Sequence, residues 1–356
     1  MKKTLFILII VSCISGRTFG QKDTIEVVFG KDEIRDRELK MFESDDILNL
    51  SLRFDIPAFK KNKADTVELD AVLTYYISET DSINKDIKIR ARGIMRRQYC
   101  DMPPIRLNFK KSDSPEDEFG NIDKIKLVTH CRLGNEDILL REYLVYKLYN
   151  LFTEYSLKVK LARITYLNTN PNRKIKPVNQ FAFLIEPMDA FCKRLDCVEL
   201  KTQKVTQKSM RPEVMNRMAI FNYMIGNTDW SVPIRHNVIV VAQPKAGRPD
   251  LAIVIPYDFD YAGMVNAEYA VPFPNLGIES VRERRYVGVC RTKEEFISAL
   301  QEFTGKKAEI YKMINEFPYL MPKSKKDIIN FLGGFYSGVE KGNAVLNRLL
   351  SECLNF

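Results

Sequence analysis

The spacing of apolar residues changes once along this chain, from the two-residue period of strands to the longer period of helices. Up to about residue 110, apolar and polar residues alternate or β-branched residues form short runs, which is typical of β-strands. Beyond about residue 292, nearly every segment carries apolar residues at helical spacing. The pattern predicts an α+β protein with a strand-rich front and a helical back. The front strands are expected at 23–29, 47–56, 65–77, 86–94 and 103–111.

The middle of the chain mixes the two patterns. One helix is expected to begin at Pro212, because proline is favoured in the first turn of a helix. A connection near 186–212 separates two expected lobes, residues 21–190 and 191–356. The other expected elements are strands 124–131, 159–168, 180–187, 237–242 and 251–259 and helices 136–153, 212–227, 293–303, 307–317 and 324–354.

The first twenty residues have the pattern of an export signal. Lys2 and Lys3 precede an apolar run from Leu5 to Val11, and small residues end the segment at Gly20. This predicts a signal peptide over residues 1–20 and a secreted or periplasmic protein. The alternative is a lipoprotein, in which the Cys13 thiol of an Ile-Val-Ser-Cys box is lipidated. No stretch approaches the ~20 apolar residues of a membrane span, so no transmembrane segment is expected.

Charge and cysteine content narrow the partners and the compartment. Removing residues 1–20 lowers the formal net charge from +9 to +6, and the remaining charges are spread along the chain. A dispersed charge is typical of a solvated surface and argues against nucleic-acid binding. Six cysteines remain, which allows up to three disulfides in fifteen pairings. Cys192 and Cys197 are close enough for a local bridge, with free thiols as the alternative. Two histidines and no CxxC pair argue against zinc.

Acidic and amide residues gather in two stretches, "MIGNTDWSVPIRHNVIVV" and "VIPYDFDYAG". Asp229 and Asn237 are expected in a loop between a helix and a strand, and Asp258 and Asp260 at the end of the next strand. Phosphoryl transfer needs one carboxylate to orient the attacking hydroxyl and an Asn and an Asp to hold a metal on the phosphates. Such oxygen ligands suit Mg²⁺ or Mn²⁺. The P-loop, dinucleotide-binding, zinc-protease and hydrolase motifs are all absent.

The same residues also have ordinary structural interpretations. Strand alternation would place Asp258 and Asp260 on one face, where two carboxylates repel each other unless a cation lies between them. Asp at strand ends and Asn-Thr-Asp after Gly are also common in caps and turns. Trp230 is expected to be a packing residue. His236 either orients the loop or serves as a structural histidine.

Several motifs in order resemble the CotH family of secreted atypical protein kinases, and in particular an exported bacterial branch of CotH-like proteins. The resemblance spans about residues 70–265. The stretches that carry it are "IKIRARGIMRRQYCDMPPIRLNF", "KLVTHCRLGNEDILLREYLVYKLYNLF", "FLIEPMDAF", "IGNTDW…HN" and "PYDFDYAG".

This resemblance implies a two-lobed protein-kinase-like fold with a β-rich N-terminal lobe, one long helix in it and a mostly helical C-terminal lobe. ATP and Mg²⁺ or Mn²⁺ are expected between the lobes. Matched motif by motif, Asp229 takes the catalytic position, and the metal positions are Asn237 and Asp258, with Asp260 as a further ligand or its support. The implied nucleotide-binding positions are Arg92 and Gly93 in the turn over the phosphates, Arg106 on a strand, Glu142 as an ion-pair partner, and Glu186 near the adenine.

Three departures from the family pattern leave the activity open. Ile94 and Met95 stand where small hydroxyl residues are usual, although the turn's N–H groups with Arg96 or Arg97 could still hold phosphate. Asp229 and Asn237 are further apart than in the protein-kinase loop, so their loop must bulge. Arg106 replaces Lys, and an arginine needs a bidentate partner. The expected function is phosphate transfer to a protein or glycan hydroxyl. The alternatives are an inactive pseudokinase-type binding module of the cell envelope and an AMP transferase.

Overall fold

The computed structural model describes residues 40–64, 67–109, 119, 122–201, 204–244 and 251–355. The predicted signal peptide and the predicted strand at 23–29 lie outside these residues. In this part of the chain, the structure contains no helix with the length and apolarity needed to cross a membrane.

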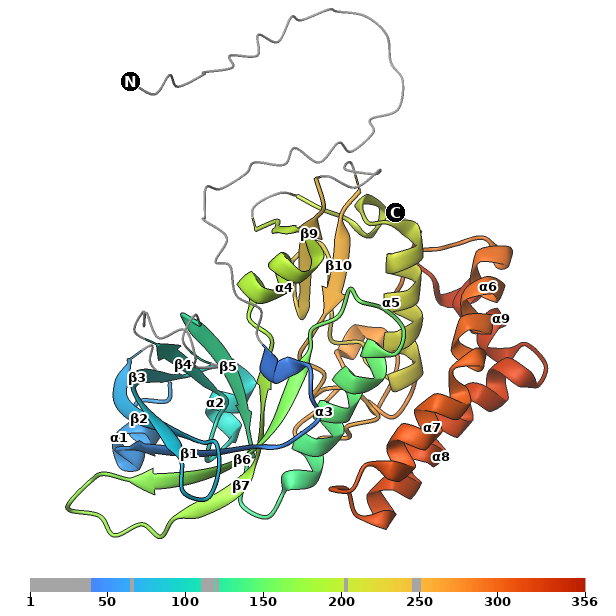
Figure 1. The fold of residues 1–356 in the computed structure, drawn as a ribbon. Coiled ribbons are helices and arrows are strands. Elements are labelled where there is room, and N and C mark those ends of the chain that lie inside the picture. The colour runs from blue at the N-terminus through green and yellow to red at the C-terminus, as the bar shows by residue number, and fades with distance from the viewer. Residues whose placement is uncertain are drawn as a thin grey trace, which may run out of the picture.

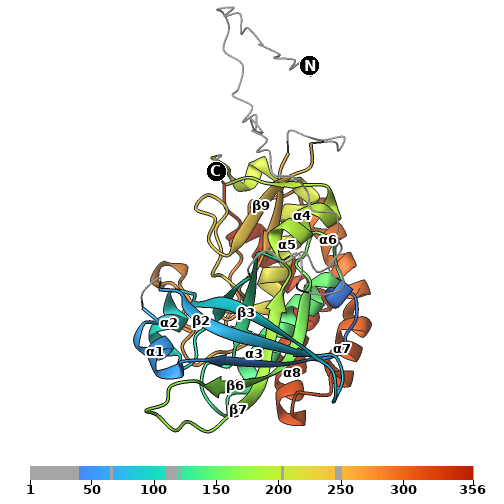
Figure 2. The same ribbon diagram turned by 60° about the vertical axis from the view of Figure 1, so that its left-hand side comes forward.

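Seven strands from the front of the chain close into a barrel (Figure 1). Neighbours around it run in the order β1-β2-β3-β4-β5-β7-β6. The barrel closes where β1 pairs in parallel with β6, from Leu48 opposite Ala162 to Phe54 opposite Asn168. Figure 2 shows the barrel from a second side, with β6 and β7 along its lower edge. The strands are β1 (Leu48–Phe54), β2 (Leu69–Tyr76), β3 (Ser82–Ala91), β4 (Ile105–Phe109), β5 (Lys124–Thr129), β6 (Val159–Asn168) and β7 (Val178–Ile185).

The expected two-lobed protein-kinase-like fold, with its β-rich N-terminal lobe, is therefore wrong. The front strands form a closed mixed barrel instead, and 37% of the residues that the structure describes are helical. The physical reason is that β1 uses both of its edges, one for β2 and one for β6. Closure leaves no free edge on that strand, and pairing across more than a hundred residues leaves no signal in local periodicity.

Alternation along the barrel strands separates an apolar interior from a basic exterior. Ile89, Leu107 and Ile125 point inward and are fully buried in the barrel core. Their neighbours in sequence therefore point outward. Arg106 lies directly opposite Arg90 on β3 and Lys126 on β5, so the three side chains form a row on the outer face.

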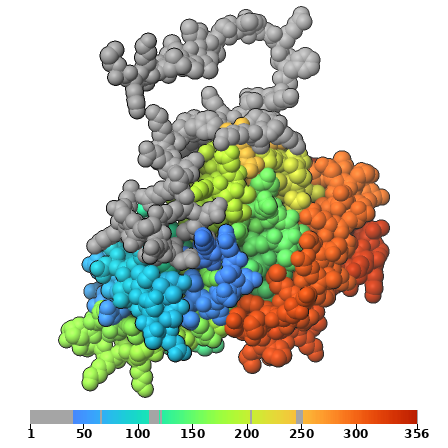
Figure 3. Space-filling view, viewed as in Figure 1, coloured from blue at the N-terminus to red at the C-terminus, as the bar shows by residue number. Residues whose placement is uncertain are grey.

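The long helix α3 (Glu136–Asn150) lies between the barrel and the C-terminal helices (Figure 1). It packs against β6, β7 and α7 (Lys307–Glu316), and ten of its side chains are buried. A helix buried on nearly all sides belongs to the interior of a larger assembly of elements. In Figure 3, green surface from the middle of the chain lies between the blue barrel strands and the orange C-terminal helices.

A small sheet completes the site region. It has the order β10-β9-β8 and packs on α5 (Pro212–Ile225). That helix begins with Pro212 in its first turn and ends at Gly226, whose φ of 68° is the left-handed conformation that favours glycine. The strands are β8 (Val198–Glu199), β9 (Val238–Ala242) and β10 (Ile253–Pro256).

The helices at the back follow the predicted pattern with one break. The expected run at 324–354 divides at Gly342 and Asn343, which both have positive φ. Its two parts are α8 (Pro322–Glu340) and α9 (Ala344–Glu352), and α6 (Lys293–Gly305) precedes α7. Shorter helices that periodicity did not indicate are α1 (Ile56–Lys61), α2 (Met95–Tyr99), α4 (Met188–Leu195) and the 3-10 turns η1 (Lys40–Phe42), η2 (Gln207–Ser209) and η3 (Pro274–Leu276).

Two disulfides are formed among the six cysteines. Cys100 is bonded to Cys131, which ties the end of α2 to the chain after β5, and Cys290 is bonded to Cys353 near the C-terminus. Cys192 and Cys197 are thiols, so the local bridge is not formed. The first disulfide lies close to the acidic residues described next.

Candidate functional site

The loop after α5 brings Asp229 and Asn237 together. Between them, Ser231 and His236 exchange two backbone hydrogen bonds of 2.9 Å, so the intervening residues form a projecting turn. Beyond that turn, the Asn237 side-chain amide donates to the backbone O of Asp229 at 2.9 Å and to its Oδ2 at 2.8 Å. The eight-residue spacing is thereby accommodated by a bulge.

Asp229 is a buried carboxylate with both oxygens engaged. His236 Nε2 lies 2.6 Å from its Oδ1, while Asn237 occupies Oδ2. Burial raises the pKa of Asp229, and the charge of Asp258 adds to this, whereas His236 and Asn237 oppose it. His236 therefore holds the Asp229 carboxylate from one side.

Asp258 follows the strand that pairs with the one after Asn237. The Tyr257 N–H donates to the backbone O of Asn237 at 3.0 Å, which fixes the two ends of the β9–β10 pair beside each other. Both Asn237 and Asp258 have left-handed φ values, 51° and 62°. Asn and Asp adopt this conformation more readily than other non-glycine residues, and strained backbone of this kind clusters at functional sites.

The Asp258 side chain is half-buried and is free of hydrogen bonds and ion pairs to the described residues. Its backbone N–H, in contrast, donates to the Tyr146 hydroxyl of α3 at 2.8 Å. Because β10 ends at Pro256, Asp258 and Asp260 follow the strand, and strand alternation does not set their directions. The Asp258 backbone is thus fixed by a hydrogen bond, whereas its carboxylate has no partner among the described residues.

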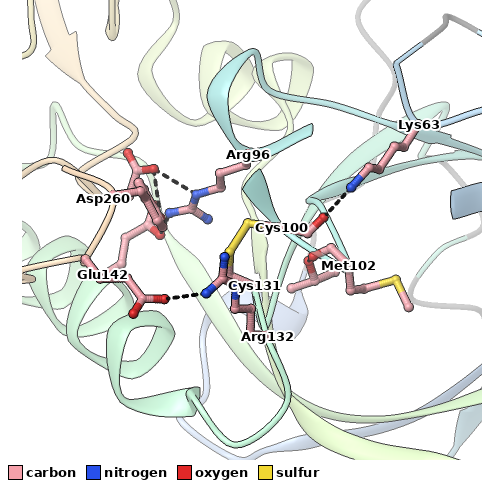
Figure 4. The surroundings of a disulfide bond; sticks show 11 residues. Lys63, Arg96, Cys100, Met102, Cys131, Arg132, Glu142 and Asp260 are labelled. Atoms are coloured by element: carbon pink, nitrogen blue, oxygen red, sulfur yellow. Dashed lines mark hydrogen bonds and ion pairs between the residues drawn. A yellow bond between two sulfur atoms is a disulfide. The ribbon is translucent and has the colours of Figure 1, made fainter. Parts of the chain in front are cut away.

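Asp260 belongs to a buried cluster around Arg96 (Figure 4). Arg96 donates from Nε to Asp260 Oδ2 at 2.8 Å and from Nη2 to Glu142 Oε2 at 2.5 Å. The Tyr269 hydroxyl donates to the same Asp260 oxygen at 3.1 Å. Glu142 therefore has an arginine partner, but it comes from α2 and is not the strand residue Arg106 that the resemblance implied.

Carboxylates outnumber cations in this cluster. Burial raises the pKa of Glu142 to about 8 and that of Asp260 to about 6, although Arg96 acts in the opposite direction on both. The charge of Asp258 raises both further, and Glu142 Oε1 is buried without a hydrogen-bond partner. One guanidinium thus faces three carboxyl groups, an arrangement that a bound cation would stabilise.

Cationic side chains without carboxylate partners among the described residues lie on the barrel side of Asp258. Lys126 Nζ lies 4.6 Å from the centre of the Tyr257 ring. Burial lowers the pKa of Lys126 to about 8, nearby Arg92 lowers it further, and Asp258 raises it. Within the described residues, Lys126, Arg92 and Arg106 have no carboxylate at ion-pair distance. Lys126 was missed by sequence reasoning, although its outward position opposite Arg106 was readable from strand alternation.

The turn before α2 is tight. Gly93 has a φ of 82°, and its carbonyl accepts a 2.6 Å hydrogen bond from Arg97 Nε. This turn carries Arg92 toward Lys126 and Arg96 toward Asp260. The two arginines therefore differ in role, since Arg96 is held in ion pairs and Arg92 is not.

Glu186 is occupied by other partners. Arg194 donates to both of its carboxylate oxygens at 2.9 Å, and the Lys158 N–H donates to Oε2 at 3.0 Å. None of the hydrogen bonds around Asp258 or Arg96 includes this residue. Its carboxylate thus ties β7 to α4, and the structure does not bring it to the acidic residues.

Trp230 is buried, as expected for a packing residue. No group of three or more His, Cys, Asp or Glu side chains in the described ranges is placed to hold a metal by itself. A cation here would need oxygens from outside the protein in addition to those of Asp258 and Asn237.

Comparison with known proteins shows a distant likeness in structure alone. No family model matches the chain, and no curated protein matches its sequence. Among solved structures, the Helicobacter pylori proinflammatory kinase CtkA is similar over 71% of this chain and 92% of that chain, with 11% sequence identity and a TM-score of 0.37. A likeness at this TM-score shows no function for this chain. It is too weak to carry an argument, so the function must be argued from the site.

Proposed function

We propose that this chain is an exported phosphotransferase of the kinase type, which uses ATP with Mg²⁺ or Mn²⁺ to phosphorylate a protein or glycan hydroxyl. The observation that carries the proposal is the linkage of Asp229, Asn237 and Asp258. Hydrogen bonds join the first two, and the Tyr257 N–H joins the second to the residue before the third.

The proposed roles follow from the partners of each side chain. Asp229 has the position of the group that orients the attacking hydroxyl, because His236 and Asn237 hold its carboxylate in one direction. Asp258 and the Asn237 side-chain oxygen have the character of metal ligands, since both supply oxygen atoms that lack a hydrogen-bond partner among the described residues. Asp260 is held by Arg96 and Tyr269, so its proposed role is to support the turn that carries Asp258.

Cations on the barrel face complete the proposed nucleotide site. Arg92, Lys126 and Arg106 are suited to phosphate oxygens because their positive charges lack carboxylate partners in the described residues. Arg92 and Gly93 belong to the turn that the resemblance places over the phosphates. Phosphoryl transfer depends mainly on positioning and on electrostatic stabilisation of this kind.

The oxygen atoms of Asp258 and Asn237 suit a divalent ion that is also bound by substrate phosphates. Mg²⁺ is usually bound by one or two carboxylates together with substrate phosphates, and rarely by an all-protein cage. A bound ion would supply charge neutralisation on the phosphates. The excess of carboxyl groups around Arg96 supports a cation at this place, because it would lower their mutual repulsion.

Incubation with labelled ATP and Mg²⁺ or Mn²⁺ tests the proposal, with the chain itself and casein as acceptors. We expect transfer of the γ-phosphate label by the wild type and its loss in Asp258→Asn. Asp70→Asn is the matched control, because Asp70 makes an exposed ion pair on the barrel. Transfer of the α-phosphate label instead would identify an AMP transferase. Metal-dependent ATP binding without either transfer would identify a binding module, and equal transfer by Asp258→Asn would refute the assigned metal position.

A further inference from the structure

A cavity that includes none of the site residues above is lined by residues of α5, α8 and α9 and of the chain between η3 and α6. Its volume is about 500 Å³, and Tyr223, Phe335 and Arg348 are among the residues that line it. Gly334 and Gly338 on α8 also belong to the wall. A Cβ at Gly334 would lie 3.6 Å from Arg284 Nη1, in ordinary van der Waals contact, so the wall at this point adjoins the guanidinium.

Positive charge is in excess around this cavity. Three arginines and two glutamates line it, and the glutamates are already engaged. Glu352 accepts a 2.8 Å hydrogen bond from the Tyr286 N–H and lies 3.4 Å from Arg285. Glu283 caps its own loop by accepting from the N–H groups of Glu279 and Ser280 at 3.0 Å. Arg284 and Arg348 are left without a carboxylate in the described part of the chain.

Arg284 is held by neutral partners alone. Its Nε donates to the Met224 carbonyl at 3.0 Å and its Nη2 to the Phe331 carbonyl at 2.6 Å. Burial lowers its pKa to about 10, with nearby Arg348 acting in the same direction. Its third nitrogen, Nη1, faces the cavity wall at Gly334. A desolvated guanidinium that lacks a counter-charge is stabilised by an anion.

Arg348 approaches the same cavity from α9. Its side chain forms a hydrogen bond with the Tyr223 hydroxyl, and the residue is exposed. Guanidinium groups match the oxygens of phosphate in both spacing and plane. Two such groups around one cavity favour a doubly charged oxyanion.

We infer that this cavity binds a small phosphate-bearing ligand, either free phosphate or a phosphate monoester, through Arg284 and Arg348. The site is separate from the proposed nucleotide site, and none of its residues belongs to that site. It borders the chain that leads to Asp229, because Arg284 holds the carbonyl of Met224 just before Gly226. The cavity has room for a small organic group beside the phosphate.

Calorimetric titration at constant ionic strength, with inorganic phosphate in one arm and glycerol 3-phosphate in the other, tests this inference. Gly334→Leu adds a side chain against Arg284 at the cavity wall, and its fold is protected because leucine is the better helix former. Arg348→Gln removes one cation, and Arg53→Gln on β1 is the control for an exposed arginine. Lys126→Met weakens phosphate binding at the proposed nucleotide site.

We expect saturable binding in the wild type, in Arg53→Gln and in Lys126→Met. Binding should weaken about tenfold or more in Arg348→Gln, as for the loss of one charged hydrogen bond. It should be abolished in Gly334→Leu without a lower melting temperature. Tighter binding of the monoester would show that the organic group also enters the cavity. Absence of saturable binding, or binding lost in Lys126→Met and unchanged in Gly334→Leu, would overturn the inference.

Discussion

Two tyrosines on α3 allow one hydrogen bond at the site to be measured against a matched control. Tyr146 and Tyr149 are both 2% exposed. The Tyr146 hydroxyl accepts the Asp258 N–H at 2.8 Å, whereas the Tyr149 hydroxyl is buried without a partner. Replacement of each by Phe removes the same oxygen from the same helix. The two variants therefore differ mainly in whether a hydrogen bond is lost.

Tyr146→Phe should lower the free energy of unfolding by about 1–3 kcal/mol, because the Asp258 N–H loses its acceptor in a partly buried place. Tyr149→Phe should change it by less than about 0.5 kcal/mol or raise it, since an unpartnered buried hydroxyl is itself unfavourable. Urea unfolding followed by circular dichroism measures both.

The same pair separates stability from function. The Asp258 backbone is held in a left-handed conformation, so loss of its anchor should also weaken Mg²⁺-dependent ATP binding in Tyr146→Phe. Tyr149→Phe should bind like the wild type. Equal losses of stability in the two variants would refute the importance of this hydrogen bond. Normal ATP binding by Tyr146→Phe would refute its role in placing the carboxylate.

Three further outcomes are expected. Lys126→Met should weaken ATP binding about tenfold, as for the loss of one charged contact. Lys124→Met, at the exposed end of the same strand, should leave ATP binding unchanged, and calorimetry measures both. Arg96→Met should lower the free energy of unfolding by about 3–5 kcal/mol, because it leaves buried carboxylates unpaired. Lys88→Met breaks an exposed ion pair of 3.1 Å and should lower it by at most about 1 kcal/mol in the same urea assay. Burial lowers the pKa of His130 to about 4 from 6.5, so its contribution to stability is complete above about pH 6.5 and falls by up to about 3 kcal/mol as the pH drops toward 4. The urea midpoint of His130→Gln should depend less on pH over that window.

Local patterns in the sequence predicted most of the individual elements. Strand β6 begins and ends where the alternation indicated, and α5 begins at the predicted proline. These elements follow from short-range rules, namely side-chain periodicity and the conformational limits of proline and glycine. Asp229 and Asn237 were also expected to come together through a bulge in the loop between them, because the two residues flank a single short loop.

Long-range pairing was not predictable in the same way. The carboxylates that pair with Arg96 lie 46 and 164 residues away in the sequence, whereas the sequence alone made this residue a candidate phosphate contact after the Gly93 turn. Closure of the barrel depends on β1 and β6, whose register is set by packing across the whole interior. Such contacts leave no periodic trace in either segment, so the kinase-like lobe was an error of topology, whereas the expected strands between residues 47 and 187 overlap β1 to β7.

Helix α3 connects these separate features. Glu142 and Tyr146 are four residues apart, so they lie on one face of the helix one turn from each other. Glu142 holds Arg96, which holds Asp260, and Tyr146 holds the backbone of Asp258. Both acidic residues after β10 are therefore positioned from the same helix face, through one charged contact and one neutral contact. Any displacement of α3 relative to the β9–β10 pair must change both contacts, so the position of this helix sets the geometry of the proposed metal site.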